Sequence, residues 1–168
     1  VMPLPAPIPP SPDASAALVA AFAEREIEWH PGTVITGLDP ERKVALVADG
    51  SEIPFDLFLA IPKHVAPAVL VESGLTEDGW VPVDFATLET STPDVYAVGD
   101  CTSVGTPKAG VFSEGQAAVA AEAILAKIRG DEVHPYDGSA ACYLEFGHDQ
   151  VARVDIQFMK GEPPRGKL

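Results

Sequence analysis

Asp100 and its neighbours carry the clearest chemical signal in this sequence. Val95 to Val98 has the apolar character of a short buried strand, and it runs directly into Gly99 and Asp100. Glycine lets a backbone turn tightly and approach a ligand closely. An acid at the carboxyl end of a strand stands where open α/β sheets bind ligands. This placement favours a ligand-binding role for the Asp100 carboxylate over the alternative, an ordinary aspartate of a turn.

A predicted helix follows, from about Gly110 to Arg129, with Gly130 as its stop signal. Its interior is rich in alanine, and small residues allow close approach to a sheet or to a ring. The first N–H groups of a helix have no partner inside it. Together with the Lys108 cation, they are suited to stabilise negative charge on a ligand. The alternative for Lys108 is a solvated lysine of the loop.

The segment from Thr92 to Asp100, with its loop and Ala-rich helix, resembles the second FAD-binding motif of FAD-dependent pyridine nucleotide-disulfide oxidoreductases. The resemblance implies that Asp100 holds a ribityl hydroxyl of FAD and that the helix points its positive end at the flavin pyrimidine. Thr106 to Val111 also resembles the Pro-Lys-Thr-Gly segment of sulfide:quinone oxidoreductases, with alanine in place of threonine. The predicted cofactor-binding residues are therefore Gly99, Asp100, Pro107, Lys108, Ala109 and Gly110.

Cys142 is the candidate catalytic residue. The stretch from Ser139 to Gly147 resembles the Cys-x-x-x-x-Gly stretch of sulfide:quinone oxidoreductases and of the flavoprotein of flavocytochrome c sulfide dehydrogenase. The resemblance implies that Cys142 pairs with a cysteine from an earlier part of the enzyme and takes up sulfide sulfur beside the flavin, as a thiolate can. The alternative is a small buried cysteine on a strand. Cys101 is interpreted as structural.

The pyrophosphate fingerprint G-x-G-x-x-G, with which this family begins, does not occur in the 168 residues. The chain therefore resembles the C-terminal part of such a flavoenzyme. We expect the N-terminal half of the FAD domain to be its partner. We also expect FAD retention by this chain alone to be weak, and uncovered sheet edges to favour a homo-oligomer.

The resemblance implies a parent enzyme that moves two electrons from a sulfur donor to FAD and on to an acceptor. Two alternatives stay open: an NADH:quinone oxidoreductase-like flavoenzyme in which Cys142 is structural, and a non-catalytic fragment that associates with itself. Whether the chain alone is an enzyme is left open.

The composition of the chain limits the classes of molecule that it could bind. A net charge of −14 argues against nucleic acid and anionic membrane surfaces. No amphipathic segment follows Pro163, which argues against membrane association and a quinone acceptor. The cysteines and histidines lack metal-ligand spacing, so no metal site is predicted. Two cysteines fit a reducing compartment or a redox site, and the expected localisation is cytoplasmic.

The order of the predicted helices and strands that position these residues indicates an α/β fold. We expect a parallel sheet, a β-meander and a β-rich C-terminal region. We expect residues 1–83 to end a second nucleotide-type domain, 84–130 to be the C-terminal segment of the FAD domain, and 131–168 to start an interface domain.

Helices are predicted after Ser11 and at 66–73. Strands are predicted at 33–38, 43–48 and 51–55, with a type I′ turn at Asp49-Gly50, and at 56–62 and 80–83, with a final hairpin at 141–146 and 151–158.

Overall fold

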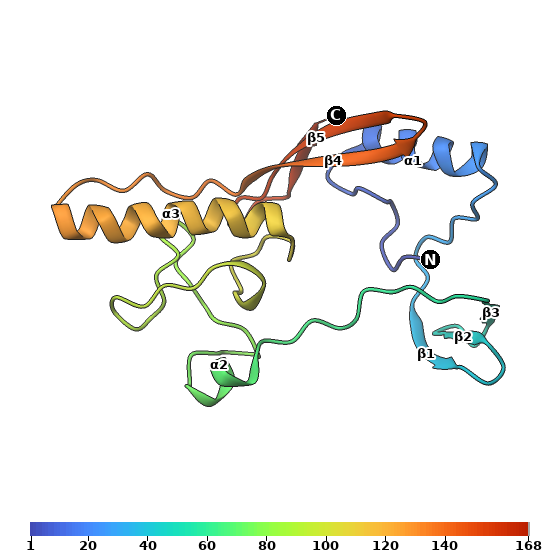
Figure 1. Ribbon diagram of the computed structural model, residues 1–168, viewed down its shortest axis with the longest axis horizontal. Helices are drawn as coiled ribbons and strands as arrows, with labels where there is room; N and C mark the ends of the chain where they lie inside the picture. The colour runs from blue at the N-terminus through green and yellow to red at the C-terminus, as the bar shows by residue number, and fades with distance from the viewer. Residues whose placement is uncertain (168) are drawn as a thin grey trace.

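The computed structural model describes residues 1–167. It contains three α-helices, one short 3₁₀ helix and two three-stranded antiparallel sheets, so the α/β class is confirmed. Figure 1 shows α1 and the first sheet at one end of the molecule and the long helix α3 at the other, with an extended segment running between them.

Helix α1 (Pro12–Glu24) forms where its cap predicts. The Ser11 hydroxyl accepts a hydrogen bond from the Ala14 N–H at 3.4 Å, and Pro12 occupies the first turn, where its missing N–H is no loss. At the other end of α1, Arg25 donates to the carbonyls of Ala21 and Phe146. The second of these bonds joins α1 to the C-terminal part of the chain.

The predicted meander is confirmed as β1 (Ile35–Asp39), β2 (Val44–Val47) and β3 (Glu52–Pro54), which pair in the order β1-β2-β3. The predicted type I′ turn at Asp49-Gly50 is wrong. That turn requires positive φ at both central residues, whereas only Gly50 has it, at 88°. The Gly50 N–H instead donates to the Val47 carbonyl at 3.0 Å, which closes a longer connection.

The predicted buried strand at 56–62 is also wrong. The segment is extended, but its backbone takes part in none of the hydrogen bonds among residues 1–167. Leu57, Leu59 and Ile61 remain 74%, 82% and 84% exposed. A strand is buried only when neighbouring elements cover it, and within the described residues no strand pairs with this one.

Helix α3 (Gly110–Arg129) has the predicted bounds, and Gly130 ends it with φ of 77°. Its buried residues recur with helical spacing and form a stripe: Phe112, Gln116, Ala120, Ala123 and Ala126. Ala120 packs with Leu88 and Tyr136, and the Tyr136 ring lies 5.4 Å from that of Phe85. The main core therefore lies between α3 and the segments on either side of it in sequence.

The segment that leads to Asp100 is extended but pairs only through isolated bridges. Val81 pairs with Thr102 in parallel, and Glu89 pairs with Tyr96 in antiparallel fashion. The predicted strands at 80–83 and 95–98 thus form isolated bridges rather than strands. The predicted parallel sheet does not form among residues 1–167, where both sheets are antiparallel. Helix α2 (Ala68–Glu72), which precedes this region, matches the helix predicted at 66–73.

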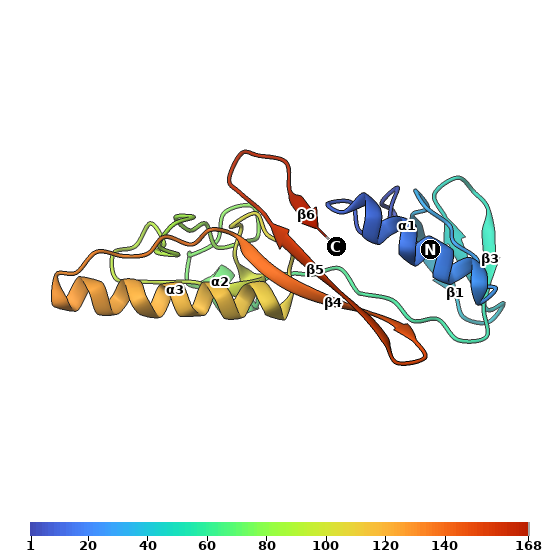
Figure 2. The same cartoon turned by 90° about the horizontal axis from the view of Figure 1, so that it is seen from above.

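The predicted C-terminal hairpin is confirmed as β4 (Ser139–Gly147) and β5 (Gln150–Gln157). His148 and Asp149 have φ of 53° and 58°, the geometry of a type I′ turn. A short strand that the sequence did not predict, β6 (Arg165–Lys167), pairs with β5. Figure 2 shows this sheet crossing from α3 toward α1.

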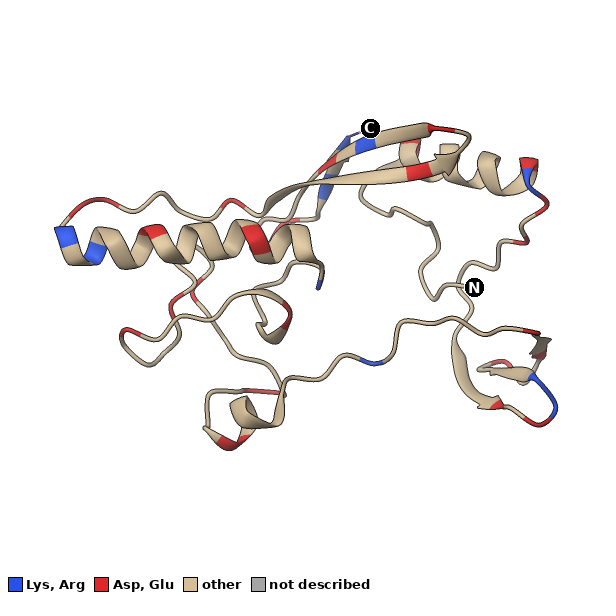
Figure 3. Cartoon of the chain, viewed as in Figure 1, with Lys and Arg blue, Asp and Glu red and all other residues tan. Residues whose placement is uncertain are grey.

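Charged side chains are spread along the whole chain rather than gathered on one element (Figure 3). Within the described residues, no helix is long and apolar enough to cross a membrane, and no group of three or more acidic, histidine or cysteine side chains could hold a metal ion. The predicted domain boundaries near 83 and 130 stay predictions.

Candidate functional site

The Gly99–Asp100 turn lies against the first turns of α3. Gly99 opens the 3₁₀ helix η1 (Gly99–Cys101) with φ of 76°, and a Cβ atom at this position would lie 2.8 Å from the Ser113 hydroxyl. Only glycine therefore fits. The next residue, Asp100, is exposed, and within residues 1–167 its carboxylate takes part in no ion pair.

The start of α3 leaves backbone donors available. Ala109 is the N-cap residue and supplies no side-chain hydrogen bond, while its carbonyl accepts from Phe112 at 3.0 Å and from Ser113 at 3.2 Å. Among the hydrogen bonds of the described residues, none uses the N–H of Gly110 or Val111. Just before the helix, the carbonyl of the exposed Pro107 accepts from the Ala109 N–H at 3.0 Å. The helix therefore presents two N–H groups and the positive end of its dipole near Asp100.

Lys108 turns back onto the protein. Its ammonium group donates to the carbonyl of Asp100 and to that of Thr102 at 3.0 Å, and it lies 3.5 Å from the centroid of the Trp80 ring. Burial lowers the pKa of Lys108, an effect that the nearby Asp100 partly opposes. The structure thus gives Lys108 a role in holding the loop, and direct action on a ligand stays a prediction.

Two contacts fasten the segment before Asp100 along α3. Near one end, the Gln116 amide oxygen accepts from the Gly99 N–H at 2.7 Å. Near the other, the Lys127 ammonium lies 2.8 Å from an Asp94 carboxylate oxygen, which raises the pKa of Lys127. The five residue-to-residue steps from Asp94 to Gly99 span about 17 Å when extended, and the eleven helical steps from Gln116 to Lys127 span about the same length. The strand-like segment and the helix are therefore matched in length and run in opposite directions.

Gln116 was missed by the reasoning from sequence, although a signal was present. It is the one polar residue in the buried stripe of α3, where an amide is expected to have specific partners. Its Nε2 atom donates to the Thr106 hydroxyl at 3.0 Å, so Gln116 contacts both segments that carry predicted site residues.

Cys142 lies on β4, half-buried and opposite Val154 of β5. The base of this hairpin lies near the start of α3, where Phe158 packs edge-on against Phe112 at 5.5 Å. Cys142 is three residues into β4, or about 10 Å along the strand. Both Cys142 and Cys101 are free thiols. Cys101 is half-buried, with its Sγ atom 3.5 Å from the Val98 carbonyl oxygen.

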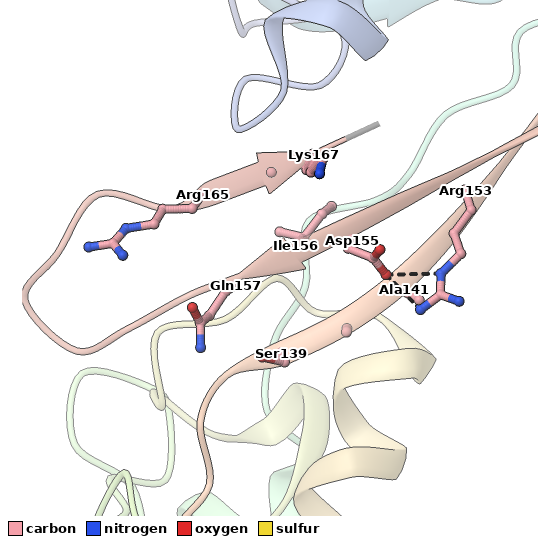
Figure 4. Close-up of a pocket in the computed structure, with 10 residues that line it drawn as sticks. Ser139, Ala141, Arg153, Asp155, Ile156, Gln157, Arg165 and Lys167 are labelled. Carbon is pink, nitrogen blue, oxygen red and sulfur yellow. Dashed lines mark hydrogen bonds and ion pairs between the residues drawn. The ribbon is translucent and has the colours of Figure 1, made fainter.

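A separate hollow of about 600 Å³ lies on one face of the C-terminal sheet (Figure 4). The cationic residues Arg153, Arg165 and Lys167 line it. Arg153 lies 2.7 Å from Asp155, and Arg165 lies 2.6 Å from Glu162, so both guanidinium groups already have anionic partners. The predicted site residues do not line this hollow.

The geometry around Asp100 fits one end of a flavin cofactor. An exposed carboxylate suits a ribityl hydroxyl, and the uncapped start of α3 suits the electron-rich pyrimidine edge of the ring. Gly99, Asp100 and Gly110 are the residues that would hold this group. The sequence lacks the glycine-rich cradle for the pyrophosphate, so the fit covers only part of FAD.

The chain belongs to the pyridine nucleotide-disulphide oxidoreductase family, whose model matches residues 5–123. That range includes Asp100 and the first part of α3.

Two curated relatives are mitochondrial sulfide:quinone oxidoreductases. The chain is 28% identical to the mouse protein over 109 residues, which cover 63% of this chain and 24% of the relative. It is 32% identical to the Schizosaccharomyces pombe protein over 130 residues, which cover 73% of this chain and 28% of the relative. The chain thus spans about a quarter of the length of these relatives.

Solved structures show the same fold. The sulfide:quinone oxidoreductase of Aquifex aeolicus matches 93% of this chain and 41% of its own, with a TM-score of 0.66 and 21% identity. The ferredoxin reductase of the CYP199A2 system from Rhodopseudomonas palustris matches 95% of this chain and 41% of its own, with a TM-score of 0.65 and 21% identity.

Proposed function

We propose that this chain forms part of an FAD-dependent oxidoreductase related to sulfide:quinone oxidoreductases. In this proposal the enzyme moves two electrons from a sulfur donor to FAD and then to an acceptor. The observation that carries the proposal is the exposed Asp100 carboxylate beside the uncapped start of α3. The curated relatives support the sulfur donor, because two of them are sulfide:quinone oxidoreductases.

Each residue of the site has a defined task. Asp100 accepts a hydrogen bond from the cofactor and fixes its orientation. The N–H groups of Gly110 and Val111 would stabilise negative charge on a flavin held at this site. Lys108 holds the Asp100 and Thr102 carbonyls together and so keeps the loop in place. FAD, when bound, supplies the two-electron acceptor that the side chains lack.

Cys142 is the proposed sulfur-handling residue. A thiolate at this position is one member of a cysteine pair that holds sulfide sulfur, and the second cysteine comes from a part of the enzyme outside these residues. The alternative, an NADH:quinone oxidoreductase-like enzyme, is favoured by one observation. Cys142 lies opposite the fully buried Val154, on the apolar face of the hairpin, as a structural cysteine does.

The cofactor contact is tested by titrating the chain with FAD and following its backbone amides by NMR. We expect the amides of Gly99, Asp100, Gly110 and Val111 to shift, and Asp100→Ala to weaken binding roughly tenfold through loss of a charged hydrogen bond. The matched control is Asp131→Ala, which removes an exposed carboxylate beyond the end of α3. Shifts confined to other residues would contradict the assignment.

The sulfur chemistry is tested in the flavin-loaded enzyme that contains these residues. Cys142→Ser should abolish flavin reduction by sulfide while leaving FAD bound, because a hydroxyl cannot form the sulfur–sulfur bond. Cys101→Ser is the control and should reduce its flavin at the parental rate. If Cys142→Ser also does so, Cys142 is structural and the NADH-dependent alternative is preferred.

A further inference from the structure

Gln116 is the most deeply buried polar residue of α3, with 1% of its surface exposed. It lies in the buried stripe between Phe112 and Ala120, where an apolar side chain would match its neighbours. A buried amide destabilises a fold unless its polar atoms are hydrogen-bonded. Packing alone therefore does not explain a glutamine at this position.

Both ends of the Gln116 amide are occupied by groups from the candidate site. Oε1 accepts from the Gly99 N–H at 2.7 Å, and Nε2 donates to the Thr106 hydroxyl at 3.0 Å. The Gly99 N–H can only donate, which fixes the amide oxygen toward it. One side chain thus links the turn that carries Asp100 to the loop that leads into α3.

The link to Gly99 restrains a backbone that is otherwise easy to move. Gly99 has positive φ and no side chain of its own, so its backbone has more freedom than that of any other residue type. The hydrogen bond from Gly99 to Gln116 is short, and Gly99 directly precedes Asp100 in the sequence. Without it, the Gly99 N–H loses its acceptor and the turn loses a constraint on its orientation.

We propose that Gln116 is a positioning residue, which acts through the Gly99 N–H to hold the Asp100 carboxylate ready for the cofactor. This inference rests on the proposed function, in which Asp100 binds FAD. Holding a ligand-binding group in its bound geometry raises affinity, because less freedom is lost on binding. Gln116 does not touch the cofactor in this proposal.

The test compares Gln116→Met, which keeps the length of the side chain but removes both polar atoms, with the matched control Gln157→Met. Gln157 is half-buried on β5 and donates to the Asp137 carbonyl, which is not one of the predicted site residues. Two quantities are measured at a temperature where each variant is folded: hydrogen exchange of the Gly99 amide by NMR, and the dissociation constant for FAD. We expect Gln116→Met to raise each roughly tenfold and the control to leave both unchanged.

A second variant keeps the test decisive if Gln116→Met does not fold. Thr106→Val removes only the far partner of the Gln116 amide, and it should raise the FAD dissociation constant by a smaller factor. Faster Gly99 exchange with an unchanged dissociation constant shows a purely structural role and overturns the inference, as does unchanged exchange. We expect the unaltered chain to bind FAD weakly. Complete absence of FAD binding counts against the proposed function instead, while Gly99 exchange still decides whether Gln116 restrains the turn.

Discussion

The Nζ atom of Lys108 lies 3.5 Å from the centroid of the Trp80 ring, and the same atom donates to the carbonyls of Asp100 and Thr102. A cation over the face of an indole is attracted by the ring quadrupole. The contact therefore ties the loop before α3 to the segment around Trp80, and both to the turn that carries Asp100.

Replacing Lys108 tests this contact. We expect Lys108→Met to lower the free energy of unfolding by about 1–3 kcal/mol, since two carbonyls and the Trp80 face lose a partly exposed cation. Lys108→Arg retains the charge and the ring contact, and should lose less. Urea unfolding followed by circular dichroism measures both values. Equal stability of Lys108→Met and the unaltered chain would show that the loop is held by other contacts.

Alanine substitutions at two glycines with positive φ distinguish the cost of backbone strain from the cost of a steric clash. Gly99→Ala places a methyl group 2.8 Å from the Ser113 hydroxyl, whereas Gly105→Ala, at φ of 97°, meets nothing within 4 Å. Gly105→Ala should destabilise by about 1 kcal/mol through strain alone, and Gly99→Ala by about 2–4 kcal/mol. Thermal unfolding measures both. The double variant Gly99→Ala with Ser113→Gly should recover part of the difference, and strict additivity would contradict the steric explanation.

Asp84 gives the fold a defined dependence on acid pH. The N–H of Thr87 donates to its carboxylate at 2.9 Å and holds the pKa of Asp84 below its usual value. Because the folded-state pKa is the lower one, the stabilisation is present above the unfolded pKa and is lost as pH falls through the folded pKa.

We expect Asp84→Asn, which keeps an acceptor oxygen but not the charge, to be less stable than the unaltered chain near pH 7. This difference in stability should narrow as pH falls below about 3.9, the usual pKa of an unfolded aspartate, and should vanish below the folded-state pKa. Calorimetric melting temperatures between these limits measure it, with Asp131→Asn as an exposed control. A gap that stays constant across this range would rule out Asp84 as the titrating group.

The exposed segment from Leu57 to Ile61 predicts self-association through strand pairing. Antiparallel pairing of two copies about Leu59 sets Leu57 opposite Ile61 of the second copy and places apolar side chains together on one face. Sedimentation velocity at micromolar concentration should show dimers or larger species that Leu59→Lys converts to monomers. Ile128→Lys, at a side chain 76% exposed on α3, is the control. A monomeric unaltered chain would contradict the prediction.

Local signals in the sequence predicted the elements that form through local contacts. The alanine-rich pattern and Gly130 gave the bounds of α3, and the alternation around Gly147 gave the C-terminal hairpin. The segment from 56 to 62 was misjudged because its apolar run reports only a capacity for burial, and burial depends on neighbours far away in sequence. β6 is too short and polar to show a strand pattern.

The residues of the candidate site also fall into those that local sequence predicts and those whose roles depend on contacts in the folded chain. Gly99, Asp100 and the start of α3 could be predicted as site residues because they lie close together in the sequence. The roles of Gln116 and Lys108 depend on which backbone groups they meet, and sequence spacing does not show this. Gln116 was detectable only as a polar residue at helical spacing from Phe112 and Ala120.

The bond from Arg25 to the Phe146 carbonyl constrains the order in which the chain can fold. The two residues are 121 positions apart, and closing a loop of that size costs about 4 kcal/mol of chain entropy. Helix α3 and the β4–β5 hairpin need no such closure and can form early. Docking of α1 onto the hairpin tip is therefore a late step with a high entropic barrier. For the same reason, α1 should be the first element to detach when the folded chain begins to open.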